Sequence, residues 1–200
     1  MKLRHLLLSL VLVGPALLCA PASQAALFRF FVNLSPLNEG GNAAIISHGT
    51  GNASLLLDTT AQTLTGNIAF SGLTTNTTAA HIHCCLTAPF LPGANVGVAT
   101  LVPAFPGFPL GATSGTDSFV LDLTSAASYN PAFVNLFPNL SAAEAAFIAG
   151  LENGGTYLNI HTSMFPGGEI RGFVVPEPMT MSLVGLGLAA AGFVSRRRKS

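Results

Sequence analysis

The sequence predicts an all-β body: an antiparallel, Greek-key-like β-sandwich of about eight strands with one short helix. We expect an N-terminal signal peptide and a C-terminal transmembrane helix to flank this body. Three observations predict the fold class. Short segments rich in β-branched and aromatic residues alternate between two faces, turns containing Gly, Pro or Asn separate them, and only one segment carries clear helix-start signals.

The predicted strands are segments in which apolar residues recur at every second position. In residues 63–71, Leu64 and Ile68 share one face while Thr65 lies on the other, and we expect a hairpin with residues 51–58. The full set is residues 28–34, 51–58, 63–71, 79–84, 96–102, 115–123, 156–162 and 168–175. The segments predicted as loops include residues 35–41, 87–95, 103–114 and 124–138.

One helix is predicted because Ser141 and Glu144 form the Ser-x-x-Glu pattern of a capping box. We expect Ser141 to be the N-cap and Glu144 the third helical residue. An Ala-rich run continues to residue 149, and Gly150 can end the helix in a left-handed conformation.

The N-terminal residues have the pattern of a secretory signal peptide. Lys2 and Arg4 give a basic start, residues 6–18 are apolar, and small residues lead to Ala25. Signal peptidase acts on this order of segments. We therefore expect residues 1–25 to be removed during export.

A second apolar segment lies near the C-terminus. Residues 179–194 carry no charge, and at about 1.5 Å per residue they make a slightly short membrane-spanning helix. The basic tail that follows should stay in the cytoplasm, which leaves the body outside. The motif before the helix and the cluster after it are Pro176, Glu177, Pro178, Arg196, Arg197 and Arg198.

This order of motif, apolar helix and basic tail resembles the PEP-CTERM sorting signal of Gram-negative bacteria. The resemblance implies recognition and cleavage by an exosortase. The helix would then anchor the chain in the inner membrane until processing, after which the protein reaches the cell surface or extracellular matrix. An ordinary tail anchor is the alternative.

Charge in the body excludes one class of partner. Between the terminal segments, Arg29 and Arg171 are the only basic residues, against seven acidic ones. A mildly acidic body has no basic patch to neutralise phosphates, so nucleic-acid binding is excluded. The length of this body, about 150 residues, suffices for one domain with a hydrophobic core.

Two predicted strands carry histidines at positions that share a face. In residues 79–84, His81 and His83 lie on one face, because successive side chains of a strand point to opposite sides. In the later strand His161 lies on the face of Asn159. If these strands are neighbours, three imidazoles converge.

Two interpretations of His81, His83 and His161 stay open. In the first they bind one copper or zinc ion, for which imidazole is a suitable ligand. Cys85 would share their face in a regular strand and could add a sulfur ligand. In the second interpretation, which we favour, the histidines hydrogen-bond backbone, Thr or Asn groups inside the sandwich and fix the strand register.

Two further groups flank the histidines. Cys84 and Cys85 are adjacent, so we expect reduced thiols or a bridge between the two, not a long-range cross-link. Downstream, the glycine pair at residues 167–168 allows a tight turn before the last strand. Glu169 and Arg171 should share a strand face, with Arg171 pairing a carboxylate or capping carbonyls near the histidines.

Three sequence blocks resemble the CHRD domain, a family named for its occurrence in chordin. They are Ala-His-Ile-His at residues 80–83, Asn-Ile-His-Thr at residues 159–162, and the block from Pro166 through Gly167 and Gly168 to Gly172. The resemblance implies an extracellular β-sandwich without a settled catalytic activity. The chain departs from the family pattern at residues 84–85, where glycine usually follows the histidines.

A weaker likeness to copper–zinc superoxide dismutase lies in the paired-histidine strand and the later strand ending in histidine. That family uses further histidines and an aspartate to hold zinc. This sequence has no histidine between His83 and His161, so a full binuclear site is not expected.

The resulting division of the chain is residues 1–25 as signal peptide, 26–174 as a CHRD-like domain and 175–200 as sorting signal. Our first hypothesis is an exported, non-enzymatic surface or matrix protein that binds extracellular polysaccharide or other surface proteins. Signal peptidase and an exosortase would be its partners during export. The second hypothesis is a metalloprotein in which His81, His83 and His161 hold copper or zinc in a superoxide-dismutase-like sandwich.

Overall fold

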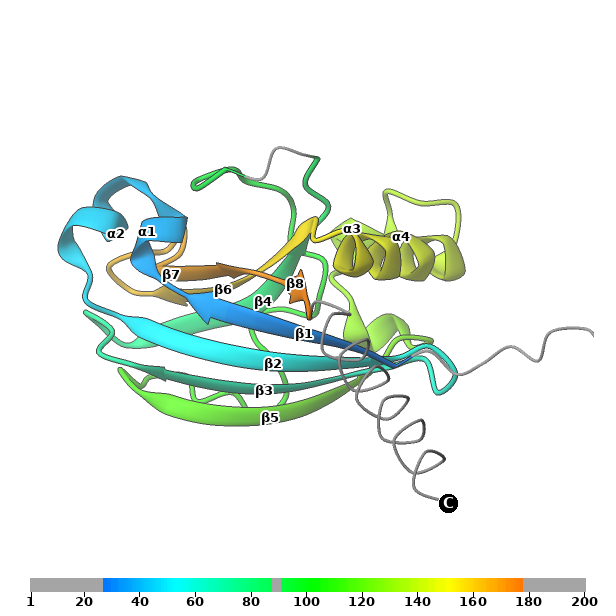
Figure 1. Cartoon of the computed structure of the whole chain (residues 1–200), viewed down its shortest axis with the longest axis horizontal. Coiled ribbons are helices and arrows are strands. Elements are labelled where there is room, and N and C mark those ends of the chain that lie inside the picture. Colours follow the sequence, from blue (N-terminus) through cyan, green and yellow to red (C-terminus); the bar gives the residue numbers. More distant parts are fainter. Residues whose placement is uncertain (1–26, 88–90, 178–200) are drawn as a thin grey trace, which may run out of the picture.

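The structure is a computed structural model of the 200-residue chain, and it describes residues 27–87 and 91–177 (Figure 1). The predicted signal peptide, the predicted transmembrane helix, Pro178 and the basic tail lie outside these residues. No helix in the described part of the chain is long and apolar enough to cross a membrane.

Eight antiparallel strands of the described residues form two sheets in a sandwich-like arrangement (Figure 1). The larger sheet has the order β5-β3-β2-β1-β8, and the smaller sheet has the order β4-β6-β7. The bounds are β1 (Leu27–Leu34), β2 (Thr50–Asp58), β3 (Thr63–Ser71), β4 (Thr77–Cys84), β5 (Gly115–Asp122), β6 (Thr156–Thr162), β7 (Ile170–Phe173) and β8 (Val175–Pro176).

One hydrophobic core lies between the sheets. Alternate residues of the longer strands point into it, including Phe30 and Val32 on β1, Ile82 on β4 and Ile160 on β6. The strands of the larger sheet expose their other face, whereas β6 is buried at every position. Segments outside the two sheets must therefore cover the second face of the smaller sheet.

Short helices lie at both ends of the sandwich. In Figure 1, α1 and α2 lie at one end and α3 and α4 at the other, and α1 packs against β7. The helices are α1 (Pro36–Glu39), α2 (Gly41–Ile46), α3 (Pro131–Val134), α4 (Leu140–Glu152) and the 3-10 helix η1 (Ala126–Ser128).

The predicted β-sandwich is confirmed at this level, but two predicted strands are wrong. Residues 96–102 form no continuous strand, since Val98 and Thr100 make only isolated bridges while the segment runs along the edge of β4. The strand predicted over residues 168–175 is divided, because the chain changes sheets: β7 pairs with β6, and β8 pairs with β1.

Two predicted loops contain helices whose caps were missed. Ser35 accepts a hydrogen bond from the backbone N–H of Leu37 at 3.1 Å and begins α1, with Pro36 in its first turn. Asn130 begins α3 in the same way, again with a proline behind it. A polar cap followed by proline is a helix-start signal, even when the helix is a single turn.

The start of α4 also differs from the prediction. Asn139 is the N-cap, because its Oδ1 accepts from the backbone N–H of Ala142 at 2.9 Å. Ser141 lies inside the helix. Glu144 does not close a capping box; its Oε1 accepts from Nε2 of Gln62 at 2.8 Å and ties the helix to the β2–β3 turn.

Replacing Asn139 with alanine should lower the free energy of unfolding by about 1 kcal/mol, because the first turn of α4 loses its cap. Ser141→Ala is the matched control and should change stability by less than about 0.5 kcal/mol. Urea unfolding of the purified protein, followed by circular dichroism, measures both. A larger loss for Ser141→Ala than for Asn139→Ala would contradict this assignment.

Candidate metal centre

The register between β4 and β6 decides which side chains share a face of the smaller sheet. His81 pairs with Asn159, and His83 pairs with Tyr157. Directly paired residues of antiparallel strands project to the same side. His161, two residues beyond Asn159, projects to that side as well, so the structure brings all three histidines together.

The hydrogen-bonding interpretation placed the histidines inside the sandwich, but their face of the smaller sheet is the one that points away from the larger sheet. Ile82 and Ile160, which neighbour the histidines in sequence, belong to the hydrophobic core. The histidines therefore point away from the core, under the segments that cover the smaller sheet. They are still buried, with exposed fractions of 5% for His81, 8% for His83 and 7% for His161.

The three rings form a compact group. The ring centroids of His81 and His83 are 4.8 Å apart, those of His81 and His161 are 4.6 Å apart, and those of His83 and His161 are 6.1 Å apart. One ring nitrogen from each residue lies within 4.8 Å of the other two. This spacing allows all three nitrogens to reach one ion.

Each of the three rings has one buried nitrogen without a hydrogen-bond partner in the part of the chain that the structure describes. Nδ1 of His83 lies 2.8 Å from the carbonyl oxygen of Val96, and Nδ1 of His161 lies 2.9 Å from that of Pro166. A carbonyl oxygen only accepts, so both Nδ1 atoms carry the hydrogen and both Nε2 atoms carry a lone pair. These two Nε2 atoms and Nδ1 of His81 are buried and have no hydrogen-bond partner among the described residues.

The environment keeps the rings neutral. Burial, the largest cause, lowers the pKa of His81 to about 3, and repulsion from the other two rings adds to the effect. Burial lowers the pKa of His83 to about 4, although its hydrogen bond to Val96 acts in the opposite direction. The pKa of His161 is also lowered by burial. Neutral imidazole is the form that binds metal ions.

A buried arginine holds the segments that cover the histidine face of the smaller sheet. Arg171 is fully buried, and its guanidinium donates to the carboxylate of Glu39 on α1 through two hydrogen bonds of 2.8 Å. It also donates to Oδ1 of Asn95 at 2.7 Å. The guanidinium lies 4.0 Å from the ring centroid of Tyr157, which in turn stacks on His83 at 4.5 Å. Arg171 thus ties α1 and the segment around Asn95 over the histidines.

Glu169 and Arg171 were expected to share a strand face, but Glu169 precedes β7 and makes its side-chain contacts elsewhere. Its carboxylate accepts hydrogen bonds from Ser47 Oγ at 2.7 Å, from Thr162 Oγ1 at 2.6 Å and from the backbone N–H of Thr74 at 2.6 Å. Burial alone would raise the pKa of Glu169, but these hydrogen bonds outweigh it and lower the pKa. Glu169 therefore holds loops together and is not part of the histidine group.

Cys85 does not join the histidines, because β4 ends at Cys84 and the two cysteines form a disulfide with each other. The regular alternation that would place Cys85 on the histidine face stops there. Sγ of Cys85 lies 3.5 Å from the carbonyl oxygen of Ala146 on α4. A Cβ at Gly150 would lie 2.5 Å from Sγ of Cys84, so the absence of a side chain at Gly150 makes room for the disulfide beside α4. Gly150 lies within α4 and does not end the helix, although the sequence pattern indicated that it could.

The glycine pair makes the turn that follows β6. Gly168 has a φ of +131°, and a Cβ there would lie 2.5 Å from Nδ2 of Asn159. Gly167 offers its carbonyl oxygen to the same Nδ2 at 3.4 Å. The turn therefore folds closely over β6 and brings the carbonyl of Pro166 to His161.

The sequence-based search for site residues missed four contributors. Tyr157 lies two residues before Asn159 in the same strand, so the alternation already placed it on the histidine face. Glu39 and the carbonyls of Val96 and Pro166 come from segments without periodicity. No sequence pattern indicates which strand such segments cover.

Comparison with known proteins identifies both parts of the chain. The family model of the CHRD domain matches residues 30–174. The model of the PEP-CTERM protein-sorting motif matches residues 174–199, which implies export, sorting to the surface and processing by an exosortase. No curated protein and no solved structure matches the chain.

The stability of the metal-free protein should depend on pH through the histidines. The pKa values of His81 and His83 lie at about 3 and about 4 in the folded state, below the ordinary 6.5. At a pH between the folded-state pKa and 6.5, each of these histidines is protonated in the unfolded chain but neutral in the folded protein. The folded state therefore loses stability as the pH falls through 6.5. The loss should reach up to about 1.4 kcal/mol per pH unit for each such histidine.

Urea unfolding between pH 7 and 5, with a chelator present, measures this dependence. The double variant His81→Gln, His83→Gln should show a flatter profile, because glutamine does not titrate. A wild-type stability that stays constant from pH 7 to 5 would rule out neutral, buried histidines.

Proposed function

We propose a function from one established premise: the chain belongs to the CHRD-domain family. With its sorting motif, the protein would be exported and delivered to the cell surface, where its β-sandwich binds one copper or zinc ion. His81, His83 and His161 would be the protein ligands. The proposal joins the export route with the metal site that was our second hypothesis.

One observation carries the proposal: His81, His83 and His161 each have a buried ring nitrogen without a hydrogen-bond partner in the described part of the chain, and the three residues offer ring nitrogens within 4.8 Å of one another. A buried polar atom left unpaired costs about 1–3 kcal/mol, and native proteins seldom leave several in one place. A purely structural cluster would use these nitrogens in hydrogen bonds. A metal ion satisfies all three at once.

The surroundings of the rings suit a metal site. Metal-bound histidines usually donate their second N–H to a carbonyl or carboxylate, which fixes the tautomer and the ring orientation. His83 and His161 have this arrangement through Val96 and Pro166. The donors are neutral imidazoles, which suit copper and zinc. Three protein ligands would leave a position for water or a small molecule.

The export route adds three proposals for the ends of the chain. Signal peptidase would remove residues 1–25, so that the chain would begin with the domain of residues 26–174, still followed by the sorting signal. The predicted helix in residues 179–194 would hold the chain in the inner membrane of a Gram-negative bacterium. An exosortase would then separate the domain from this anchor, and the protein would remain at the surface or in the extracellular matrix.

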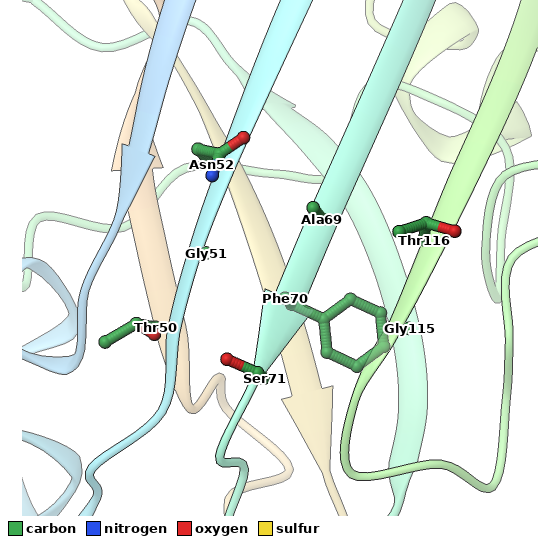
Figure 2. Close-up of a pocket in the computed structure, with 8 residues that line it drawn as sticks. All are labelled: Thr50, Gly51, Asn52, Ala69, Phe70, Ser71, Gly115 and Thr116. Carbon is green, nitrogen blue, oxygen red and sulfur yellow. The ribbon is translucent and has the colours of Figure 1, made fainter.

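The outer face of the larger sheet supports a second function, which is binding to extracellular polysaccharide. A shallow hollow of about 480 Å³ lies across β2, β3 and β5 (Figure 2). Thr50, Asn52, Ser71 and Thr116 line it with uncharged hydroxyl and amide groups. Such groups can exchange hydrogen bonds with the hydroxyls of a neutral sugar chain. This matches our first hypothesis of a non-enzymatic matrix protein.

Metal analysis tests the first proposal. The purified wild-type protein, loaded with copper or zinc and then desalted, should retain about one ion per chain. The double variant His81→Ala, His161→Ala should retain none, because two of three ligands are gone. His48→Ala, which changes an exposed histidine, is the matched control and should bind like the wild type.

Circular dichroism of each variant shows whether it is folded. A folded wild-type protein that retains no metal, together with a double variant that is only less stable, would refute the metal site.

Binding to matrix polysaccharide tests the second function. The double variant Asn52→Asp, Thr116→Asp should lower the affinity about tenfold or more, because it places unpaired charge in the hollow. Asn67→Asp adds a charge to the same face outside the hollow and is the control. Sedimentation with polysaccharide from the producing cells measures binding. Equal affinity of the wild type, the double variant and Asn67→Asp for the polysaccharide would exclude the hollow as the binding surface.

A further inference from the structure

The sorting motif begins inside the folded domain. β7 ends at Phe173, and the next residue, Val174, is fully buried in the core. β8 then pairs with β1 on the edge of the larger sheet, as the short strand beside β1 in Figure 1 shows. Pro176, the first residue of the motif, is part of β8, and the backbone N–H of Glu177 donates to the carbonyl of Arg29 at 2.9 Å.

This arrangement leaves little chain between the domain and the membrane. Glu177 is held to β1, and the predicted membrane-spanning stretch begins at residue 179. Two residues reach at most about 7 Å. If β8 separates from β1 while Val174 stays in the core, residues 175–177 are released, and the five steps from Val174 to residue 179 reach about 17 Å. Separation of β8 therefore both exposes the motif and lengthens the tether.

We infer that pairing of β8 with β1 withholds the sorting motif from the exosortase, so that processing requires β8 to detach. The inference rests on the proposed export function and concerns the same motif. A peptidase that binds an extended segment needs the backbone of that segment free of other partners. In the folded domain Pro176 is paired with Phe30 of β1, and the backbone N–H of Glu177 donates to the carbonyl oxygen of Arg29.

The contacts of β8 suit a strand that can open. Only two residue pairs join it to β1, Phe31 with Val175 and Phe30 with Pro176. The side chains of Phe31 and Val175 are 55% and 54% exposed, so they lose little burial when the strand leaves. Elements with few buried contacts open locally at far lower cost than the whole domain. Detachment breaks no covalent bond; cleavage of the peptide bond is left to the exosortase.

A reversible cross-link tests the inference. Phe31 and Val175 are directly paired, and the Cα atoms of such pairs are about 4.5–5.5 Å apart, within the range of a disulfide. The full-length double variant Phe31→Cys, Val175→Cys should be processed at least tenfold more slowly when oxidised. Reduction should restore the wild-type rate. The shift from precursor to mature size on a gel, in cells with the exosortase, measures processing.

The single variants Phe31→Cys and Val175→Cys are the controls, because they carry the native Cys84–Cys85 disulfide without the cross-link. They should be processed alike with and without reductant. Equal processing of the oxidised and reduced double variant would overturn the inference. Failure of the sorting assignment looks different: a chain without Pro176, Glu177 and Pro178 would then be processed like the wild type.

Discussion

The pairing of β4 with β6 in a single register is the constraint on which the site depends. Side chains alternate along each strand, so a shift by one residue would turn His81 and His83 into the core and Ile82 out of it. Ile82 and Ile160 pack in the hydrophobic core, which contains none of the three histidines. The aliphatic residues that build the core therefore also hold the three rings on the opposite face.

The histidine face of the smaller sheet is buried because α1 and the segment around Asn95 lie over it, and Arg171 binds both of them. A buried cation is costly unless it is paired and hydrogen-bonded, and Arg171 meets this condition through Glu39 and Asn95. Its charge also contributes to lowering the pKa of His83 and His161. The ion pair thus helps to bury the site and favours neutral imidazoles within it.

The period of two was sufficient to predict six of the eight expected strands and the shared face of the histidines, but not the interrupted pairing of residues 96–102 or the division of residues 168–175. It could not show which face is the core, because β6 is buried on both sides. The pairing of Arg171 with Glu39 spans 132 residues of sequence and involves the single-turn helix α1, whose sequence does not indicate which strand it covers. The end of β4 at Cys84 could not be predicted either, because the alternation of side chains does not indicate where the strand ends.

The proposed metal site is tested most directly by X-ray absorption spectroscopy of the metal-loaded, purified protein at the edge of the bound metal. We predict imidazole nitrogen donors at about 2.0 Å from three histidines and no sulfur donor at about 2.3 Å. Sulfur in the first shell, or a shell of oxygen donors without imidazole, would contradict a site built from His81, His83 and His161.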